Sequence, residues 1–133
     1  MKTYVVPIPL HINYLQKAAE CWEEAQIAQA GSRWNAAVVN AVHTAISAAD
    51  ALCVFYKGVR SAGDRHEDVL TVLRSLGLDR EQTDAKARQL QRVLQIKNTA
   101  EYEEKLMSAT DAENALRDTE RFFSWVKEKL GRK

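Results

Sequence analysis

Apolar residues recur along the chain at the three- and four-residue spacing of amphipathic helices, and glycines end the pattern at several points. One periodic segment covers residues 12–30 and stops before Gly31. The next covers residues 33–56 and stops before Gly58, with Ser32 as its expected N-cap. The pattern therefore predicts two long helices in the first half of the chain.

The second half of the chain continues the helical pattern after an open link. Residues 67–76 predict a short helix that follows Asp64, its expected N-cap, and ends before Gly77. Asp79 is the expected cap of a longer helix that runs from residue 80 to near residue 98.

The last predicted helix has a clear start signal. Thr110 and Glu113 have the spacing of a capping box, in which a hydroxyl and a carboxylate each accept a hydrogen bond from an amide at the helix start. This start predicts a helix that reaches Gly131, near the end of the chain. Its apolar stripe is Ala112, Ala115, Leu116, Thr119, Phe122, Phe123, Val126 and Leu130.

These helices predict an all-α fold: an antiparallel, up-and-down bundle of four long helices and one short one. Residues 1–9 stand apart, because Pro7 and Pro9 favour an extended chain. With 133 residues, five glycines and two prolines, the sequence is expected to form one helical domain over residues 1–133.

The overall charge is nearly balanced, with 19 basic and 18 acidic residues. This balance argues against binding of nucleic acid by the whole surface, and no sequence-specific binding of DNA is expected. No apolar run is expected to reach the length of a transmembrane span, so no contact with a membrane is expected, and the first residues do not resemble a signal peptide. Cys21 and Cys53 lie in predicted helices without metal-site spacing, so we expect buried free thiols in a cytoplasmic protein. No metal and no cofactor are expected.

Polar side chains interrupt the helix predicted for residues 33–56, which otherwise is almost uncharged. Burying such groups without partners costs about 1–3 kcal/mol each, and more for a charge. For His43, Thr44 and Ser47 an ordinary interpretation is favoured, with hydroxyls bonded to their own helix and a satisfied core histidine. Asp50 is harder to explain in this way, because a carboxylate in an apolar helix needs a cation or several hydrogen-bond donors. The polar arc is Asn40, His43, Thr44, Ser47 and Asp50, extended one turn later by Lys57.

A second polar interruption ends the apolar stripe of the helix predicted for residues 80–98. There Lys97 and Asn98 are followed by Glu101 and Tyr102. If the two interrupted helices face each other, Asp50 and Lys97 would pair in a polar groove. The alternative is a helix end in solvent, where a lysine interacts favourably with the helix dipole.

The order of these segments resembles the HEPN domain family. The resemblance rests on "NAAVVNAVHTAISAADAL" and on "LQRVLQIKNTAEYEEKLMSATDAENALRDTERFFSWVKEKL", and it covers most of the chain. It implies a bundle of four to five helices that usually dimerises. It also implies a role in toxin–antitoxin or defence systems, commonly with a nucleotidyltransferase or antitoxin partner.

Many members of this family are metal-independent ribonucleases that carry an Arg and, four to six residues later, a His. This sequence departs from that motif, because Lys97 and then Asn98 stand at the matching place and Tyr102 stands where the His is expected. A tyrosine ordinarily has a pKa of about 10, and lysine lacks the bidentate fork that suits phosphate. Arg60 and His66 also fit the spacing, but they lie in the link after the second helix, where a chance match is favoured.

Three functions remain open at this point. The first is a non-catalytic or weakly active module that binds nucleotide, RNA or a protein, with Asp50, Lys97, Asn98, Glu101 and Tyr102 lining the groove. The second is a metal-independent ribonuclease, in which His66 or Tyr102 replaces the missing acid–base group and Lys97 stabilises the phosphate. The third is a purely structural homodimeric bundle. The secondary site candidates are His43, Lys57 and Arg60.

Overall fold

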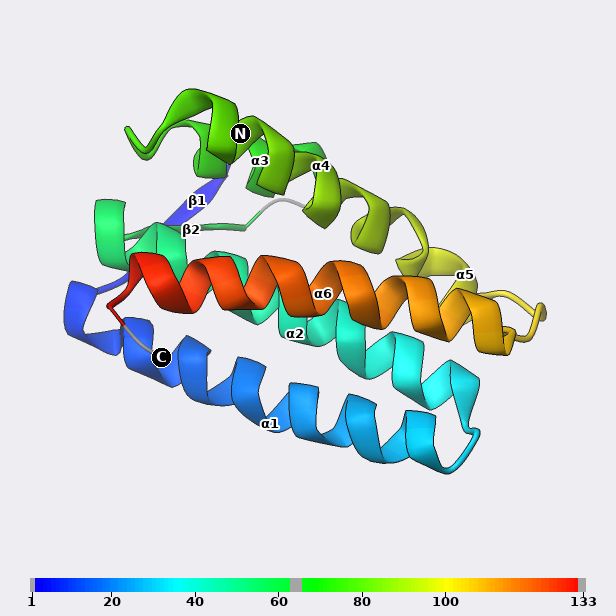
Figure 1. The fold of residues 1–133 in the computed structure, drawn as a ribbon. Helices are drawn as coiled ribbons and strands as arrows, with labels where there is room; N and C mark the ends of the chain where they lie inside the picture. Colours follow the sequence, from blue (N-terminus) through cyan, green and yellow to red (C-terminus); the bar gives the residue numbers. More distant parts are fainter. Residues whose placement is uncertain (1, 63–65, 132–133) are drawn as a thin grey trace.

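The computed structural model describes residues 2–62 and 66–131, apart from the side chains of His66 and Glu67. Within these residues the protein is all-α except for one two-stranded antiparallel sheet (Figure 1). The all-α bundle predicted from the sequence is confirmed. Its elements are β1 (Thr3–Val5), a 3₁₀ helix (Ile8–Leu10), α1 (His11–Ala30), α2 (Trp34–Lys57), β2 (Val59–Ser61), α3 (His66–Arg74), α4 (Arg80–Gln95), α5 (Lys97–Tyr102) and α6 (Ala109–Lys129).

Helix α2 is the central element of the bundle. It contacts α1 and α6 along its length and also meets α3, α4 and α5 (Figure 1). Its many buried alanines let the neighbouring helices approach closely. By length and composition alone α2 is apolar enough to cross a membrane, so the expectation that no segment reaches that threshold is wrong. Its central, mostly buried position accounts for this composition.

The chain turns sharply at the end of α2. Gly58 ends the helix in the left-handed region, with φ 65°, and β2 follows at once. Strand β1 pairs with β2, and the amide of Val6 donates to the carbonyl of Gly58 at 2.8 Å. The predicted extended start is therefore right for Thr3–Val5, whereas Ile8–Leu10 form a 3₁₀ turn that leads into α1.

Two predicted helix caps differ from those observed. Ser32 does not cap α2: it takes a positive φ of 59°, and Arg33 stands at the N-cap without a side-chain hydrogen bond. The capping box of α6 is formed by Ser108 and Asp111, two residues earlier than predicted. The cap at Asp79 is confirmed, whereas the predicted cap at Asp64 lies outside the described residues.

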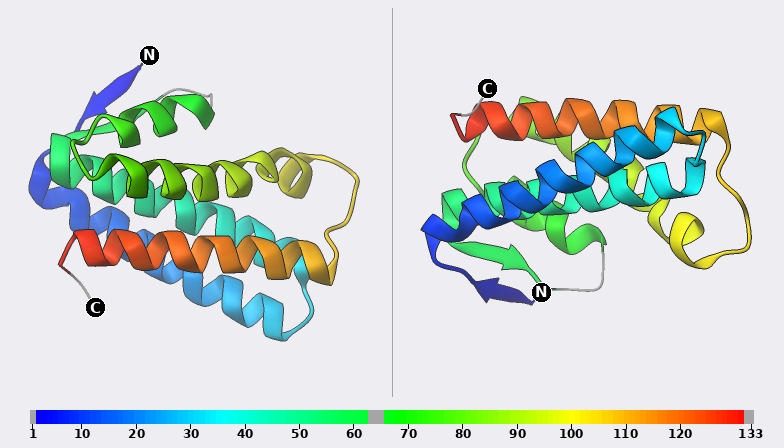
Figure 2. Two further views of the ribbon diagram at one scale, coloured as in Figure 1. Left: turned by 45° about the horizontal axis from the view of Figure 1, so that its top comes forward. Right: turned by 90° about the horizontal axis from the view of Figure 1, so that it is seen from below.

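Helices α4 and α6 run side by side (Figure 2, left). A charged pair joins them. Arg92 of α4 donates two hydrogen bonds to the carboxylate of Asp118 on α6, at 3.2 Å and 3.1 Å. This hydrogen bonding raises the pKa of Arg92 above its usual value. Asp118 is buried, so the pair satisfies a carboxylate that would otherwise lose its hydration without compensation.

The apolar stripe predicted for the last helix faces the core. All eight of its positions are buried, and Phe122 and Val126 are fully so. Met107, just before α6, is also buried, and its amide donates to the side-chain oxygen of Asn35 on α2 at 2.8 Å. The start of α6 is thus fixed by its cap and by a direct bond to the central helix.

Candidate functional site

The stretch that interrupts the apolar stripe forms a separate short helix. Helix α4 ends at Gln95, earlier than predicted, and α5 begins at Lys97 after the single residue Ile96. Ile96 and Ala100 pack against the core, and α5 contacts α2. Figure 2 shows α5 at the end of the bundle, where the chain leaves α4 for the loop to α6. The break gives α5 a direction of its own.

Glu101 of α5 lies between the side chains of His43 and Lys97. Its Oε1 lies 3.0 Å from Nε2 of His43 on α2, and its Oε2 lies 3.7 Å from Nζ of Lys97 one turn earlier. The Glu101 side chain is only 12 % exposed, whereas that of His43 is 47 % exposed. Each carboxylate oxygen therefore has a different partner, and both partners reach solvent.

The contact between Glu101 and His43 is close but is not a hydrogen bond. Oε1 of Glu101 is buried and lies 3.0 Å from Nε2 of His43, yet it has no hydrogen-bond partner among the described residues. A buried acceptor without a donor costs about 1–3 kcal/mol. The pair is an ion pair only when the imidazole is protonated, so Oε1 is the least satisfied polar atom of this group.

Tyr102 stands beside Lys97 with its ring in solvent. Its residue is 73 % exposed, and Nζ of Lys97 lies 5.9 Å from the centre of the ring. Asn98 points elsewhere: its amide donates to Oε2 of Glu103 at 2.9 Å. We call His43, Lys97, Glu101 and Tyr102 the α2–α5 cluster.

Asp50 does not join this cluster. It lies seven residues after His43, about 10 Å further along α2. The charges that act on it are Arg60 of β2 and Lys17 of α1, and no ion pair connects it to Lys97. Burial raises its pKa from 3.8 to about 7, although both cations work in the opposite direction. The sequence suggested one polar groove that contains both Asp50 and Lys97. In the structure these residues belong to two separate polar sites.

A model of the HEPN domain matches residues 13–129, which is most of the chain. The protein belongs to the HEPN domain family. The match runs from α1 to the end of α6 and includes both the central helix and α5, so the resemblance stated from the sequence is confirmed. A search of the curated proteins finds no match to this HEPN chain.

The secondary candidates of this HEPN protein are placed as follows. Lys57 donates to the hydroxyl of Ser75 at 3.0 Å, which links the end of α2 to the end of α3. Arg60 lies over the ring of Tyr4, 4.6 Å from its centre, and donates to the carbonyl of Ser61. The side chain of His66 lies outside the described residues, so its role as an acid–base group stays a prediction.

The interpretation favoured from the sequence for the polar arc of α2 is right for Thr44 and wrong for His43. The hydroxyl of Thr44 donates to the carbonyl of Asn40 at 2.8 Å, which confirms the bond back to its own helix. His43, by contrast, is not a core residue, because its side chain is half exposed and meets Glu101. Cys53 is a buried free thiol as expected, and burial raises its pKa to about 12, whereas Cys21 is only partly buried.

The pairing of His43 with Glu101 was missed by the sequence argument. Both residues were among the candidates, but they were assigned to different interpretations because the packing of α5 on α2 was not known. The helical period places His43 on the polar face of α2 and Glu101 on that of α5. The packing of α5 on α2, after α4 has ended at Gln95, brings those two faces together.

Proposed function

We propose that this HEPN protein is a non-catalytic or weakly active module that binds a nucleotide or RNA at the α2–α5 cluster. The observation that carries the proposal is the exposed ring of Tyr102 beside the ammonium group of Lys97 and the half-exposed imidazole of His43. An exposed ring stacks on a nucleobase of any sequence, and the ammonium group of Lys97 can bind the phosphate of the same nucleotide.

The sequence of α5 supports binding without efficient catalysis. The family's ribonucleases use an Arg and a His, and Lys97 and Tyr102 stand at those places here. Lysine binds phosphate as a point charge, and a tyrosine exchanges protons poorly near neutral pH. Lys97 is also partly neutralised by Glu101. Recognition of a phosphate is therefore favoured over cleavage.

Titration of the chain with a labelled single-stranded RNA and with ATP tests this proposal. Tyr102→Ala should weaken binding of RNA by about tenfold, because a stacked base contributes ~1–3 kcal/mol. Lys97→Ala should weaken binding of both ligands. Lys105→Ala is the matched control, since Lys105 is exposed and lies outside the cluster. If neither ligand binds the wild-type chain at millimolar concentration, the interaction bundle without a ligand is the better interpretation.

One observation favours a second candidate, the metal-independent ribonuclease. His43 and Glu101 form a histidine–carboxylate pair, and such a pair can orient an imidazole for proton transfer. Labelled RNA kept with the protein and a chelator should stay intact under the binding proposal. Cleavage that His43→Ala or His66→Ala abolishes, and Lys105→Ala does not, would establish the ribonuclease instead.

The family context supports two further parts of the proposal. We propose that the protein is a homodimer in solution and that it acts with a nucleotidyltransferase or another antitoxin in a toxin–antitoxin or defence system. Light scattering of the purified chain tests the dimer, and a mass near that of one chain would contradict it. A search of the neighbouring genes for a nucleotidyltransferase tests the partner, and a protein found there should purify together with this chain when the two are co-expressed.

A further inference from the structure

Strand β1 lies at the outside of the molecule with one edge unpaired. Within the described residues the sheet has two strands, and the right panel of Figure 2 shows β1 outermost, with β2 between it and the helices. Thr3, Tyr4 and Val5 are all exposed, and Val5 is 85 % exposed. A two-stranded sheet is only marginally stable in water, and an open edge is a template for a further strand. The outer edge of β1 is therefore a place where another strand can pair.

The register of the sheet decides which backbone groups of β1 are free. The amide of Val6 donates to the carbonyl of Gly58, which directs the backbone groups of Val6 and, two residues earlier, of Tyr4 toward β2. The direction alternates along a strand, so the amides and carbonyls of Thr3 and Val5 point outward. No hydrogen bond within the described part of the chain occupies these outward groups.

The outward groups are self-complementary. If two copies of β1 lie antiparallel with the two Tyr4 residues opposite each other, Thr3 of each copy lies opposite Val5 of the other. Residues opposed in this way exchange both N–H···O bonds, so all the outward groups of both strands are satisfied. The two Tyr4 rings stand between these pairs on one face of the sheet, where a directly opposed aromatic pair is stabilising.

The length of the edge matches a strand of the same kind. Pro7 is the next outward position, but it has no amide hydrogen, and its carbonyl already accepts from the amide of Leu10 at 2.9 Å. The edge that a partner can use is thus Thr3–Val5, and a longer strand would gain no further bonds. We propose that β1 pairs antiparallel with β1 of a second copy, which joins the two sheets into one. This inference rests on the homodimer proposed above and assigns its contact surface.

The charges near β1 permit this arrangement. The strand itself is uncharged, and the guanidinium carbon of Arg60 on β2 lies 4.6 Å from the centre of the Tyr4 ring. Neighbouring strands are about 4.8 Å apart, so Arg60 of the two copies would be separated by about 14 Å. This separation exceeds the screening length of about 8 Å in physiological salt. Strand edges that resist pairing often carry a charge or a proline within the strand, and β1 carries neither.

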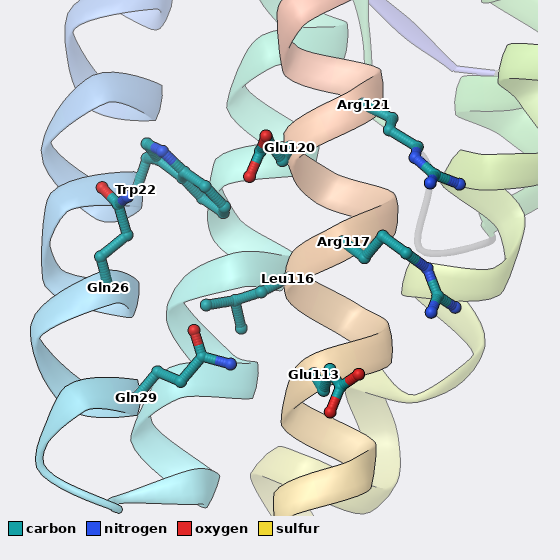
Figure 3. A pocket seen from close by; sticks show the side chains of 8 residues that line it. All are labelled: Trp22, Gln26, Gln29, Glu113, Leu116, Arg117, Glu120 and Arg121. Carbon is teal, nitrogen blue, oxygen red and sulfur yellow. The ribbon is translucent and has the colours of Figure 1, made fainter.

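The polar hollow between α1 and α6, by contrast, does not select a partner. It has a volume of about 320 Å³ and is lined by Glu113 and Glu120 together with Arg117 and Arg121, which Figure 3 shows along the same helix. Charges of both signs at one place favour neither a cationic nor an anionic ligand. The edge of β1 differs, because its free groups are backbone donors and acceptors in a fixed order.

Opposite charges introduced at Tyr4 test the arrangement. Tyr4→Glu would place two carboxylates opposite each other in the dimer, and like charges directly opposite destabilise a strand pair. Tyr4→Lys would do the same with two ammonium groups. Each variant alone should dimerise about tenfold more weakly than wild type, because it also loses the aromatic pair. An equimolar mixture of the two variants should form a heterodimer, measured by energy transfer between differently labelled chains.

A second substitution removes hydrogen bonds and leaves the charge unchanged. Val5→Pro deletes the outward amide of Val5, which takes no part in the pairing with β2. It should weaken the dimer in sedimentation velocity by about tenfold, because each of the two bonds lost contributes a factor of roughly two to ten. Leu106→Glu is the control, since Leu106 is 75 % exposed in the loop before α6, at the opposite end of the bundle (Figure 2).

Two results would overturn the proposal. The first is a dimer that the Tyr4 variants and Val5→Pro form as readily as wild type and Leu106→Glu do, with no preference for the mixed pair. The homodimer would then stand and use another surface. The second is a wild-type chain that stays monomeric at about millimolar concentration, which would also contradict the homodimer and leave the edge to a strand of another protein. RNA binding at the α2–α5 cluster should be the same in all these variants, so that proposal fails separately.

Discussion

The partly buried carboxylate of Asp50 should make the protein less stable as the pH rises toward neutrality. Its pKa is about 7 in the folded chain and 3.8 when exposed, so between these values the folded state holds a proton that the unfolded state has lost. Stability contributed by the protonated carboxyl is therefore complete below about pH 4 and is lost by about pH 7. Asp50→Asn, which cannot ionise, should escape this loss.

The size of the effect follows from the two pKa values. They differ by about three units, and each unit corresponds to about 1.4 kcal/mol, so the ionised carboxylate destabilises the fold by up to ~4 kcal/mol. Arg60 and Lys17 already moderate the burial cost within that figure. Asp50→Asn should therefore have a free energy of unfolding several kcal/mol above that of wild type at pH 8 and close to it at pH 4.

Urea denaturation followed by tryptophan fluorescence at several pH values measures this difference. Other groups titrate as well, so the informative quantity is variant minus wild type at each pH. Asp84→Asn is the control: it removes a carboxylate in an exposed ion pair with Arg74 and should change stability by less than about 1 kcal/mol at any pH. A difference curve for Asp50→Asn that is flat between pH 4 and pH 8 would refute the burial argument.

Two further substitutions test how α6 is held. Asp118→Ala removes the buried acceptor of two hydrogen bonds from α4, so it should lower the free energy of unfolding in urea by about 1–3 kcal/mol. Arg117→Ala, on the exposed side of α6, is the control and should change it by less than about 0.5 kcal/mol. Ser108→Ala should cost about 1 kcal/mol because it removes the observed N-cap, while Thr110→Ala should cost much less; equal losses would contradict the capping assignment.

Much of the fold could be predicted because the helices carry their period and their ends in the local sequence. The stops at Gly31 and Gly58 were placed correctly, since α1 and α2 end just before these residues. Start signals were less certain at α6. Ser108 with Asp111 and Thr110 with Glu113 both have capping-box spacing, and the buried Met107 that precedes α6 favours the earlier pair.

The candidate site could be predicted only in part, because helical period does not say which helices are neighbours. Asp50 and Lys97 each lie on the polar face of a helix. Asp50 interacts electrostatically with Arg60 of β2 and Lys17 of α1, whereas Lys97 pairs with Glu101 of its own helix. The turn at Ile96 decides this, and its sequence carries neither glycine nor proline to announce a break. The meeting of His43 and Glu101 is a consequence of that turn.

Helix α5 has a further consequence for the motions of the protein. It has six residues, and an isolated helix of that length is unstable in water. Its order therefore depends on Ile96 and Ala100 against the core and on the contact of Glu101 with His43. We therefore expect α5 to exchange its amide hydrogens sooner than α2 does. A ligand bound at Lys97 and Tyr102 would then be seen first as slower exchange in α5, even where its contacts are few.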